Sequence, residues 1–123
     1  MKELRRQFYD QLLAWKDSKG KECLLVKGAR QVGKTYIIRK FGRENYEKFI
    51  EINFTKEPNL ISAFDGNLDA DTVFSGISAL RRDFEIIPGR TLLFLDELQD
   101  CPNARTAFKF LAEDGRCDVV ASG

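Results

Sequence analysis

The amino-acid sequence predicts an α/β fold in which a parallel β-sheet is flanked by helices. Two observations lead to this fold class. Short apolar runs alternate along the chain with segments whose apolar residues recur at helical spacing. The runs are also continuously apolar, as in strands that are buried on both faces of a parallel sheet. Alternating strands and helices of this kind form three layers.

The helices are predicted from apolar residues three and four positions apart and from the residues at their ends. In the first helix, Leu4, Phe8, Leu12 and Trp15 form one apolar stripe. Pro58 and Pro102 mark the starts of two later helices. Gly42 is expected to end the second helix and Gly115 the last. The expected helices cover residues 3–16, 34–41, 58–64, 69 or 71 to 84, and 102–115.

The strands are predicted from short apolar runs that follow or precede turn residues. The strongest run, Thr91-Leu92-Leu93-Phe94-Leu95, comes after a Pro-Gly turn and ends in Asp96-Glu97. The expected strands cover residues 23–26, 48–54, 91–95 and 118–121.

Composition excludes several kinds of chemistry. The 123 residues include no histidine, so a Ser-His-Asp triad, a Cys-His dyad and an imidazole general base are excluded. A zinc site with histidine ligands is excluded for the same reason. Any catalysis is therefore expected from carboxylates, lysine, hydroxyls, backbone amides or a bound metal.

The cysteines and the apolar segments indicate a compartment. Cys23, Cys101 and Cys117 are odd in number and form no CxxC pair, so we interpret them as free thiols in a reducing cytoplasm. No segment approaches the roughly 20 apolar residues of a membrane-spanning helix. The basic N-terminus also lacks the continuous apolar region of a signal peptide. The sequence therefore predicts a cytoplasmic protein without membrane contact.

A phosphate-binding motif, G-A-R-Q-V-G-K-T, lies between the first expected strand and the next helix. Its glycines allow the backbone to curl, so that N–H groups and the start of the helix form an anion site. Lys34 is expected to contact the β- and γ-phosphates, and the Thr35 hydroxyl to bind Mg²⁺. The predicted nucleotide-binding residues are Gly28, Ala29, Arg30, Gln31, Val32, Gly33, Lys34 and Thr35.

Two carboxylates follow the strongest strand. Loops at the carboxyl ends of parallel strands share one edge, so Asp96 is expected to meet the 28–35 loop. Asp96 would hold Mg²⁺ together with Thr35, and Glu97 would orient and polarise the attacking water. We therefore predict Glu97 and Lys34 as catalytic residues. The adjacent acids favour a water-activating ATPase over a small-molecule kinase or a GTPase-like switch.

Ser122 ends the last expected strand. If that strand lies between the strand before the motif and the strand that ends in Asp96, Ser122 would lie at the γ-phosphate edge. We treat Ser122 as a candidate nucleotide sensor. A strand-terminal turn serine is the alternative interpretation.

Together these segments resemble the AAA-type ATPase domain of a family of bacterial and archaeal ATP-binding proteins. In that family a C-terminal domain of poorly defined function follows the ATPase domain. The resemblance rests on residues 28–35, on F-L-D-E-L-Q-D-C-P at 94–102 and on V-V-A-S-G at 119–123, and segments 9–16 and 87–91 are also similar. It implies ATP at the loop, Mg²⁺ at Thr35 and Asp96, and Glu97 as the hydrolytic carboxylate.

The resemblance also implies parts that do not follow Gly123: a further strand, later helices and an arginine contact. We therefore expect residues 1–123 to be a partial AAA-type nucleotide-binding domain that is deficient in turnover. Its fold would be a three-layer phosphate-loop NTPase fold, truncated before the last strand and the helical lid. Residues 23–27 would then form an unpaired sheet edge, through which we expect self-association.

The predicted function is Mg²⁺-dependent ATP binding and hydrolysis. In an alternative interpretation, the chain is a nucleotide-gated switch or interaction module whose ATP state controls a protein partner. A third interpretation, a nucleic-acid-associated ATPase, draws on charge: residues 1–48 carry a net +7 and residues 49–123 a net −6. Two oppositely charged faces of one fold explain the same asymmetry, and the sequence does not identify a partner.

Overall fold

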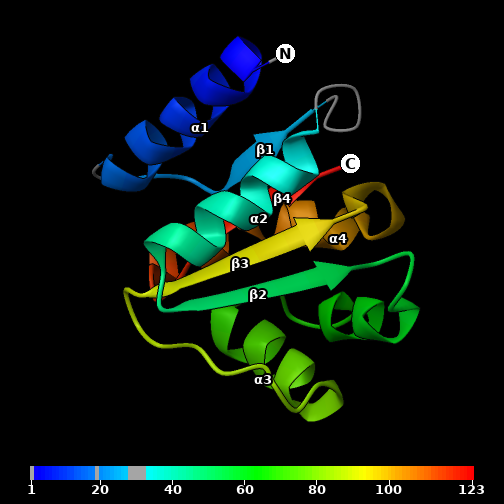
Figure 1. Ribbon diagram of the computed structural model, residues 1–123. Coiled ribbons are helices and arrows are strands. Elements are labelled where there is room, and N and C mark those ends of the chain that lie inside the picture. Colours follow the sequence, from blue (N-terminus) through cyan, green and yellow to red (C-terminus); the bar gives the residue numbers. More distant parts are fainter. Residues whose placement is uncertain (1, 19, 28–32) are drawn as a thin grey trace.

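The computed structural model describes residues 2–18, 20–27 and 33–123. In these ranges a parallel β-sheet lies between two layers of helices (Figure 1). The strands are β1 (Leu24–Val26), β2 (Lys48–Asn53), β3 (Thr91–Asp96) and β4 (Asp118–Ser122). The predicted α/β fold of the phosphate-loop NTPase kind is therefore confirmed.

The last strand in the sequence occupies the middle of the sheet. The strand order in the described chain is β1-β4-β3-β2, and neighbouring strands are parallel. Val26 pairs with Ser122, and Leu95 pairs with Ala121. The carboxyl ends of β1, β4 and β3 therefore lie side by side, as the interpretation of Ser122 requires.

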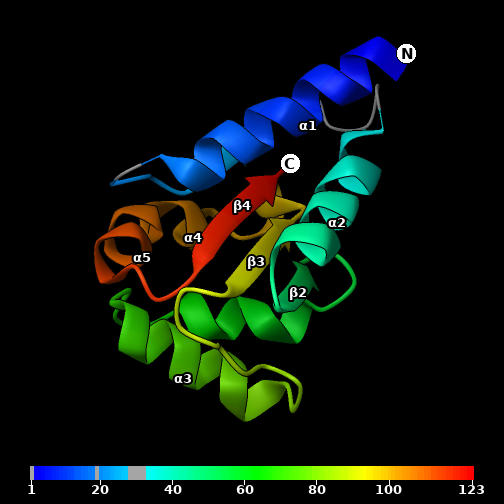
Figure 2. The same cartoon turned by 60° about the vertical axis from the view of Figure 1, so that its left-hand side comes forward.

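Helices cover both faces of the sheet (Figures 1 and 2). α1 and α2 pack on one face, and the later helices pack on the other. The helical elements are α1 (Lys2–Asp17), α2 (Lys34–Asn45), η1 (Pro58–Phe64), α3 (Ala70–Leu80), η2 (Leu98–Asp100), α4 (Pro102–Thr106) and α5 (Phe108–Asp114), where η marks a 3₁₀ helix.

β3 explains why the strongest apolar run is continuous. All six of its residues are buried. Leu92 and Phe94 pack with α1 and α2, whereas Leu93 and Leu95 pack with η1 and α3 to α5. Because successive side chains of a strand point to opposite faces, a strand covered on both sides needs apolar residues at consecutive positions, as at 92–95.

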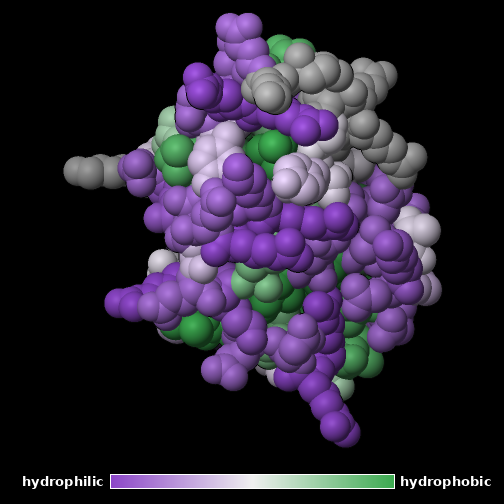
Figure 3. All heavy atoms as spheres, in the orientation of Figure 1, coloured by the Kyte–Doolittle hydropathy of each residue, from purple (hydrophilic) through white to green (hydrophobic). Residues whose placement is uncertain are grey.

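α2 is amphipathic, and it is longer than predicted. Ile37, Ile38 and Phe41 are buried beneath it, while the outer face of the molecule over α2 is mostly hydrophilic (Figure 3). The expectation that Gly42 ends this helix is wrong, since α2 continues to Asn45. A Cβ atom at Gly42 would lie 2.3 Å from Phe49 Cδ1, so close packing of α2 on β2 accounts for the glycine.

Aromatic and polar contacts fix α1 on α2. The ring of buried Phe41 contacts the rings of Tyr9 and Trp15. The Tyr9 hydroxyl donates to Glu44 Oε1 at 2.5 Å and accepts from Asn45 Nδ2 at 2.9 Å. These contacts hold the N-terminal helix in one position across α2.

The two edges of the sheet differ. At β2, Arg81 Nη1 donates to the Glu51 carbonyl oxygen at 2.5 Å, and Glu57 Oε1 accepts from Asn53 N at 3.4 Å. These side chains occupy backbone groups that another strand would need. At the other edge, β1 pairs only with β4 among the described strands.

The cysteines are free thiols. Burial raises the pKa of Cys23 to about 12 and the pKa of Cys117 to about 12. Both thiols therefore stay protonated near neutral pH and act as small apolar side chains. In the described part of the chain, no helix combines the length and the apolar character needed to cross a bilayer.

Candidate functional site

The predicted site residues that the structure describes lie at one end of the molecule, where strands of the sheet end. Asp96 ends β3, and Ser122 ends β4, the strand next to it. The N-terminus of α2 lies at the same end of the molecule (Figure 1). Because neighbouring strands are about 4.8 Å apart, the ends of β1 and β3 are separated by roughly 10 Å with β4 between them.

A buried hydrogen-bond pair orients Asp96. Its Oδ1 atom accepts from Ser122 Oγ at 2.7 Å and from the backbone N of Glu97 at 2.9 Å. Asp96 is 8% exposed and Ser122 is 1% exposed. No hydrogen bond from a described residue reaches Oδ2. A carboxylate with one oxygen held and the other available is a suitable ligand for Mg²⁺ or for its bound water.

Glu97 follows in an unusual backbone conformation. Its φ is 58° and its ψ is 48°, a left-handed conformation that non-glycine residues rarely adopt and that is often found at functional sites. The conformation turns the chain from β3 directly into η2. The Glu97 carboxylate accepts from Gln99 Nε2 at 2.7 Å, so both residues lie at the edge where β3 ends.

The segment after β2 adds a residue that sequence reasoning missed. Thr55 Oγ1 donates to Asp100 Oδ2 at 2.5 Å and lies 3.5 Å from Glu97 Oε2. Asn53 Oδ1 holds this turn by accepting from the backbone N atoms of Thr55 and Lys56. Thr55 could have been identified from its position just past a parallel strand, because the carboxyl ends of parallel strands lie at one edge of the sheet.

The phosphate-binding motif is described only in part. Gly28, Ala29, Arg30, Gln31 and Val32 lie outside the described residues. Gly33 has a φ of 68°, which glycine adopts readily, and it directly precedes α2.

Lys34 and Thr35 form the first turn of α2. Lys34 Nζ donates to the carbonyl oxygen of Lys27, the residue after β1, at 3.2 Å. The first turn contains no acidic residue, and no side chain caps it. The positive end of the helix dipole is therefore not neutralised from within α2, which favours an anion there.

The described residues suit Mg²⁺ bound together with phosphates rather than alone. No group of three or more histidine, cysteine or carboxylate residues suited to a metal occurs in the described ranges. Mg²⁺ at nucleotide sites usually has one or two carboxylate contacts and takes its remaining ligands from phosphates and water. Asp96 and the hydroxyl of Thr35 fit this requirement.

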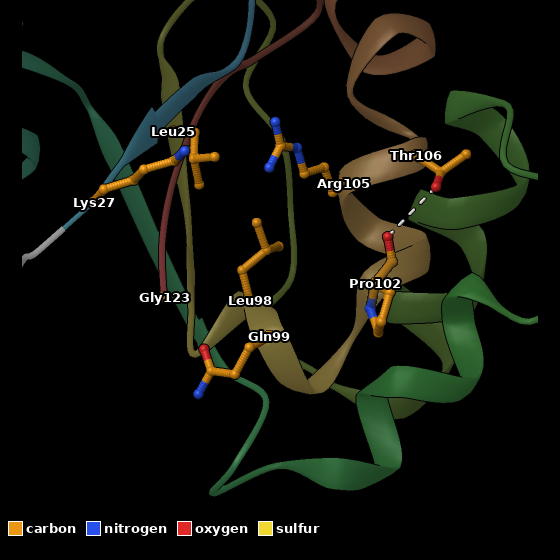
Figure 4. A pocket seen from close by; sticks show the side chains of 8 residues that line it. All are labelled: Leu25, Lys27, Leu98, Gln99, Pro102, Arg105, Thr106 and Gly123. Carbon is orange, nitrogen blue, oxygen red and sulfur yellow. Dashed lines mark hydrogen bonds between the residues drawn. The ribbon is translucent and has the colours of Figure 1, made fainter.

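A groove lies beside the site along the open side of β1. It has a volume of about 420 Å³ and is lined by Leu25 and Lys27, by Gln99 and by Arg105 of α4, among others (Figure 4). Arg105 extends from α4 into the space beside Leu25 (Figure 4). The groove thus reaches from the end of β1 to the turn after β3.

Replacing Ser122 with alanine tests the hydrogen bond to Asp96. The variant leaves Asp96 Oδ1 with the Glu97 N–H as its described donor, so we expect a loss of about 1 kcal/mol in unfolding free energy. Urea unfolding measures this loss. Ser62→Ala, which removes an exposed hydroxyl bonded to a carbonyl oxygen, is the matched control. Equal stability of Ser122→Ala and the wild type would contradict the assigned contact.

Comparison with known proteins supports the family suggested by the motifs. No curated protein matches the chain. The family model described as an AAA domain matches residues 20–123. The match includes Lys34, Thr35, Asp96, Glu97 and Ser122, and α1 precedes it. The chain therefore belongs to the AAA domain family.

Proposed function

We propose that this chain binds ATP with Mg²⁺ and that its site residues are arranged for ATP hydrolysis. Membership of the AAA domain family supports a nucleotide-binding, ATPase-like function. The observation that carries the proposal is the oriented Asp96 carboxylate at the same sheet edge as the uncapped start of α2. In this proposal, groups suited to an anion and a group suited to a cation share one site.

The residues would divide the work by charge. Lys34 and the N-terminus of α2 would bind the phosphates, and Thr35 and Asp96 would hold Mg²⁺. When bound, Mg²⁺ neutralises charge on the phosphate oxygens. Glu97 would orient water toward the terminal phosphate. Ser122 would act by fixing Asp96, so that its response to the nucleotide passes through that carboxylate.

Lys34→Ala tests the phosphate contact. Removing the ammonium group from the start of α2 should weaken ATP binding at least tenfold, because a charged contact with phosphate is lost. Titration with a fluorescent ATP analogue in the presence of Mg²⁺ measures the effect. Lys40→Ala removes the same charge from the middle of α2 and should bind ATP like the wild type. Unchanged binding by Lys34→Ala would refute the assignment.

Glu97→Gln tests the hydrolytic role. The amide keeps the size of the side chain but cannot polarise water as a carboxylate does, so we expect ATP binding within twofold of wild type and at least tenfold slower hydrolysis. Release of inorganic phosphate measures turnover. Glu85→Gln, at an exposed position outside the site, is the control.

The same assay separates an enzyme from a switch. Wild-type chain that binds ATP with a Glu97-dependent turnover supports hydrolysis. Negligible turnover together with ATP-dependent binding of a protein partner would instead support the nucleotide-gated switch. Normal turnover by Glu97→Gln would remove the role of this carboxylate. The free thiols support a cytoplasmic location, which we include in the proposal.

We also propose that the chain self-associates through β1. The support is the contrast between the two edges, because side chains cover backbone groups of β2 while β1 has one described neighbour. Unpaired strand edges pair readily with other chains. In sedimentation experiments, the dimer fraction should grow with protein concentration. Leu25→Pro places a proline in the middle of β1 and removes a backbone N–H, so this variant should have a smaller dimer fraction. A strictly monomeric chain at high concentration would contradict this.

A further inference from the structure

α1 places a second cation against the start of α2. Arg5 Nη2 lies 3.4 Å, and Arg5 Nε 3.7 Å, from the position that a Cβ atom would take on Gly33. Arg5 is an exposed residue. It makes no hydrogen bond or ion pair with the described residues, so no described carboxylate neutralises its charge there.

The position of Arg5 depends on packing that holds α1 in place. Leu12 is fully buried between α1 and the sheet, and Tyr9 is hydrogen-bonded to α2. The Phe8 ring centroid lies 5.3 Å from Lys34 Nζ, within cation–π range. Figure 2 shows the N-terminal part of α1 close to the start of α2. The packing of α1 therefore positions Arg5 beside Gly33.

Positive charge is concentrated beside Gly33. The Arg5 guanidinium lies against Gly33 at the positive end of the α2 dipole, Lys34 is the next residue, and the first turn of α2 contains no acidic residue. Gathering like charges costs free energy unless an anion lies among them. A polyphosphate carries several negative oxygens and would offset this cost.

We propose that Arg5 contacts the phosphates of the bound nucleotide, as a second cation beside Lys34. A guanidinium presents paired N–H donors that match two phosphate oxygens, which an ammonium group cannot do. This inference rests on the proposed function, since it needs a nucleotide at the start of α2. It assigns a binding role to α1, which lies before the residues matched by the family model.

Arg5→Ala and Arg6→Ala in the 123-residue chain form the test. Both variants remove one positive charge from exposed neighbouring positions of α1, but only Arg5 lies against Gly33. Titration with the fluorescent ATP analogue and Mg²⁺ at fixed salt should show about tenfold weaker binding for Arg5→Ala, the usual size of one charge-assisted contact. Arg6→Ala should stay within twofold of wild type.

Arg5→Lys adds a readout of geometry. It keeps the charge without the paired donors, so binding should be intermediate between wild type and Arg5→Ala. Thermal unfolding of each variant identifies any loss of structure. If Arg5→Ala unfolds, Arg5→Gln replaces it, because glutamine is a similarly good helix former and keeps an extended side chain.

The outcomes separate the two proposals. Suppose that the wild type binds ATP. If the folded Arg5 variants bind ATP equally well, or if Arg6→Ala weakens binding as much as Arg5→Ala does, the role of Arg5 is wrong and the proposed function stands. If wild type does not bind ATP, both proposals are wrong. A tenfold loss confined to Arg5 supports the phosphate contact.

Discussion

The site depends on the hydrogen bond that Ser122 donates to Asp96. It crosses from β4 to β3 and joins two buried polar side chains. A buried carboxylate is costly unless donors surround it, and here a hydroxyl and a backbone N–H share one of its oxygens. A shift of β4 by one residue would turn Ser122 to the opposite face of the sheet. The orientation of Asp96 is therefore tied to the strand register, and the site exists only when the sheet is correctly assembled.

The arrangement also explains the uneven charge along the sequence. The basic first part of the chain supplies Lys34 at the start of α2 and Arg5 on α1. The acidic second part supplies Asp96, Glu97 and Asp100 at the end of β3 and in the turn that follows. In the proposed function, the basic part of the chain would supply the groups that bind phosphate and the acidic part the groups that hold Mg²⁺.

The elements were predictable because burial imposes a period on the sequence. β3, covered on both faces, needed an unbroken apolar run, and the helices needed apolar residues every three or four positions. The end of α2 was not predictable from the sequence. Gly42 reflects close packing against Phe49 of β2, and a contact between two elements does not show in the pattern of a single helix. The sequence did not predict that β4 lies in the middle of the sheet, because strand order depends on long-range pairing. That position was only assumed when Ser122 was considered as part of the site.

The candidate site, like the fold, could be predicted only in part. The shared edge of parallel strand ends predicted that Asp96 lies near the 28–35 loop. Ser122 was expected at the same edge only if its strand lay between the other two. The contact between Thr55 and Asp100 depends on the shapes of two turns, which no periodicity encodes. Arg5 belongs to an exposed part of a helix, where sequence alone cannot distinguish a solvated cation from one held against a loop. The crossing of α1 over α2 decides between them.

The central position of β4 has a consequence for how the molecule reaches its native state. β1 is formed by residues 24–26, yet its described partner lies nearly a hundred residues later at 118–122. During synthesis the first strand must wait, unpaired, until almost all of the described chain has left the ribosome. Folding that depends on such distant contacts is slow. The sheet therefore closes late and cooperatively, with the nucleotide site completed in the same step.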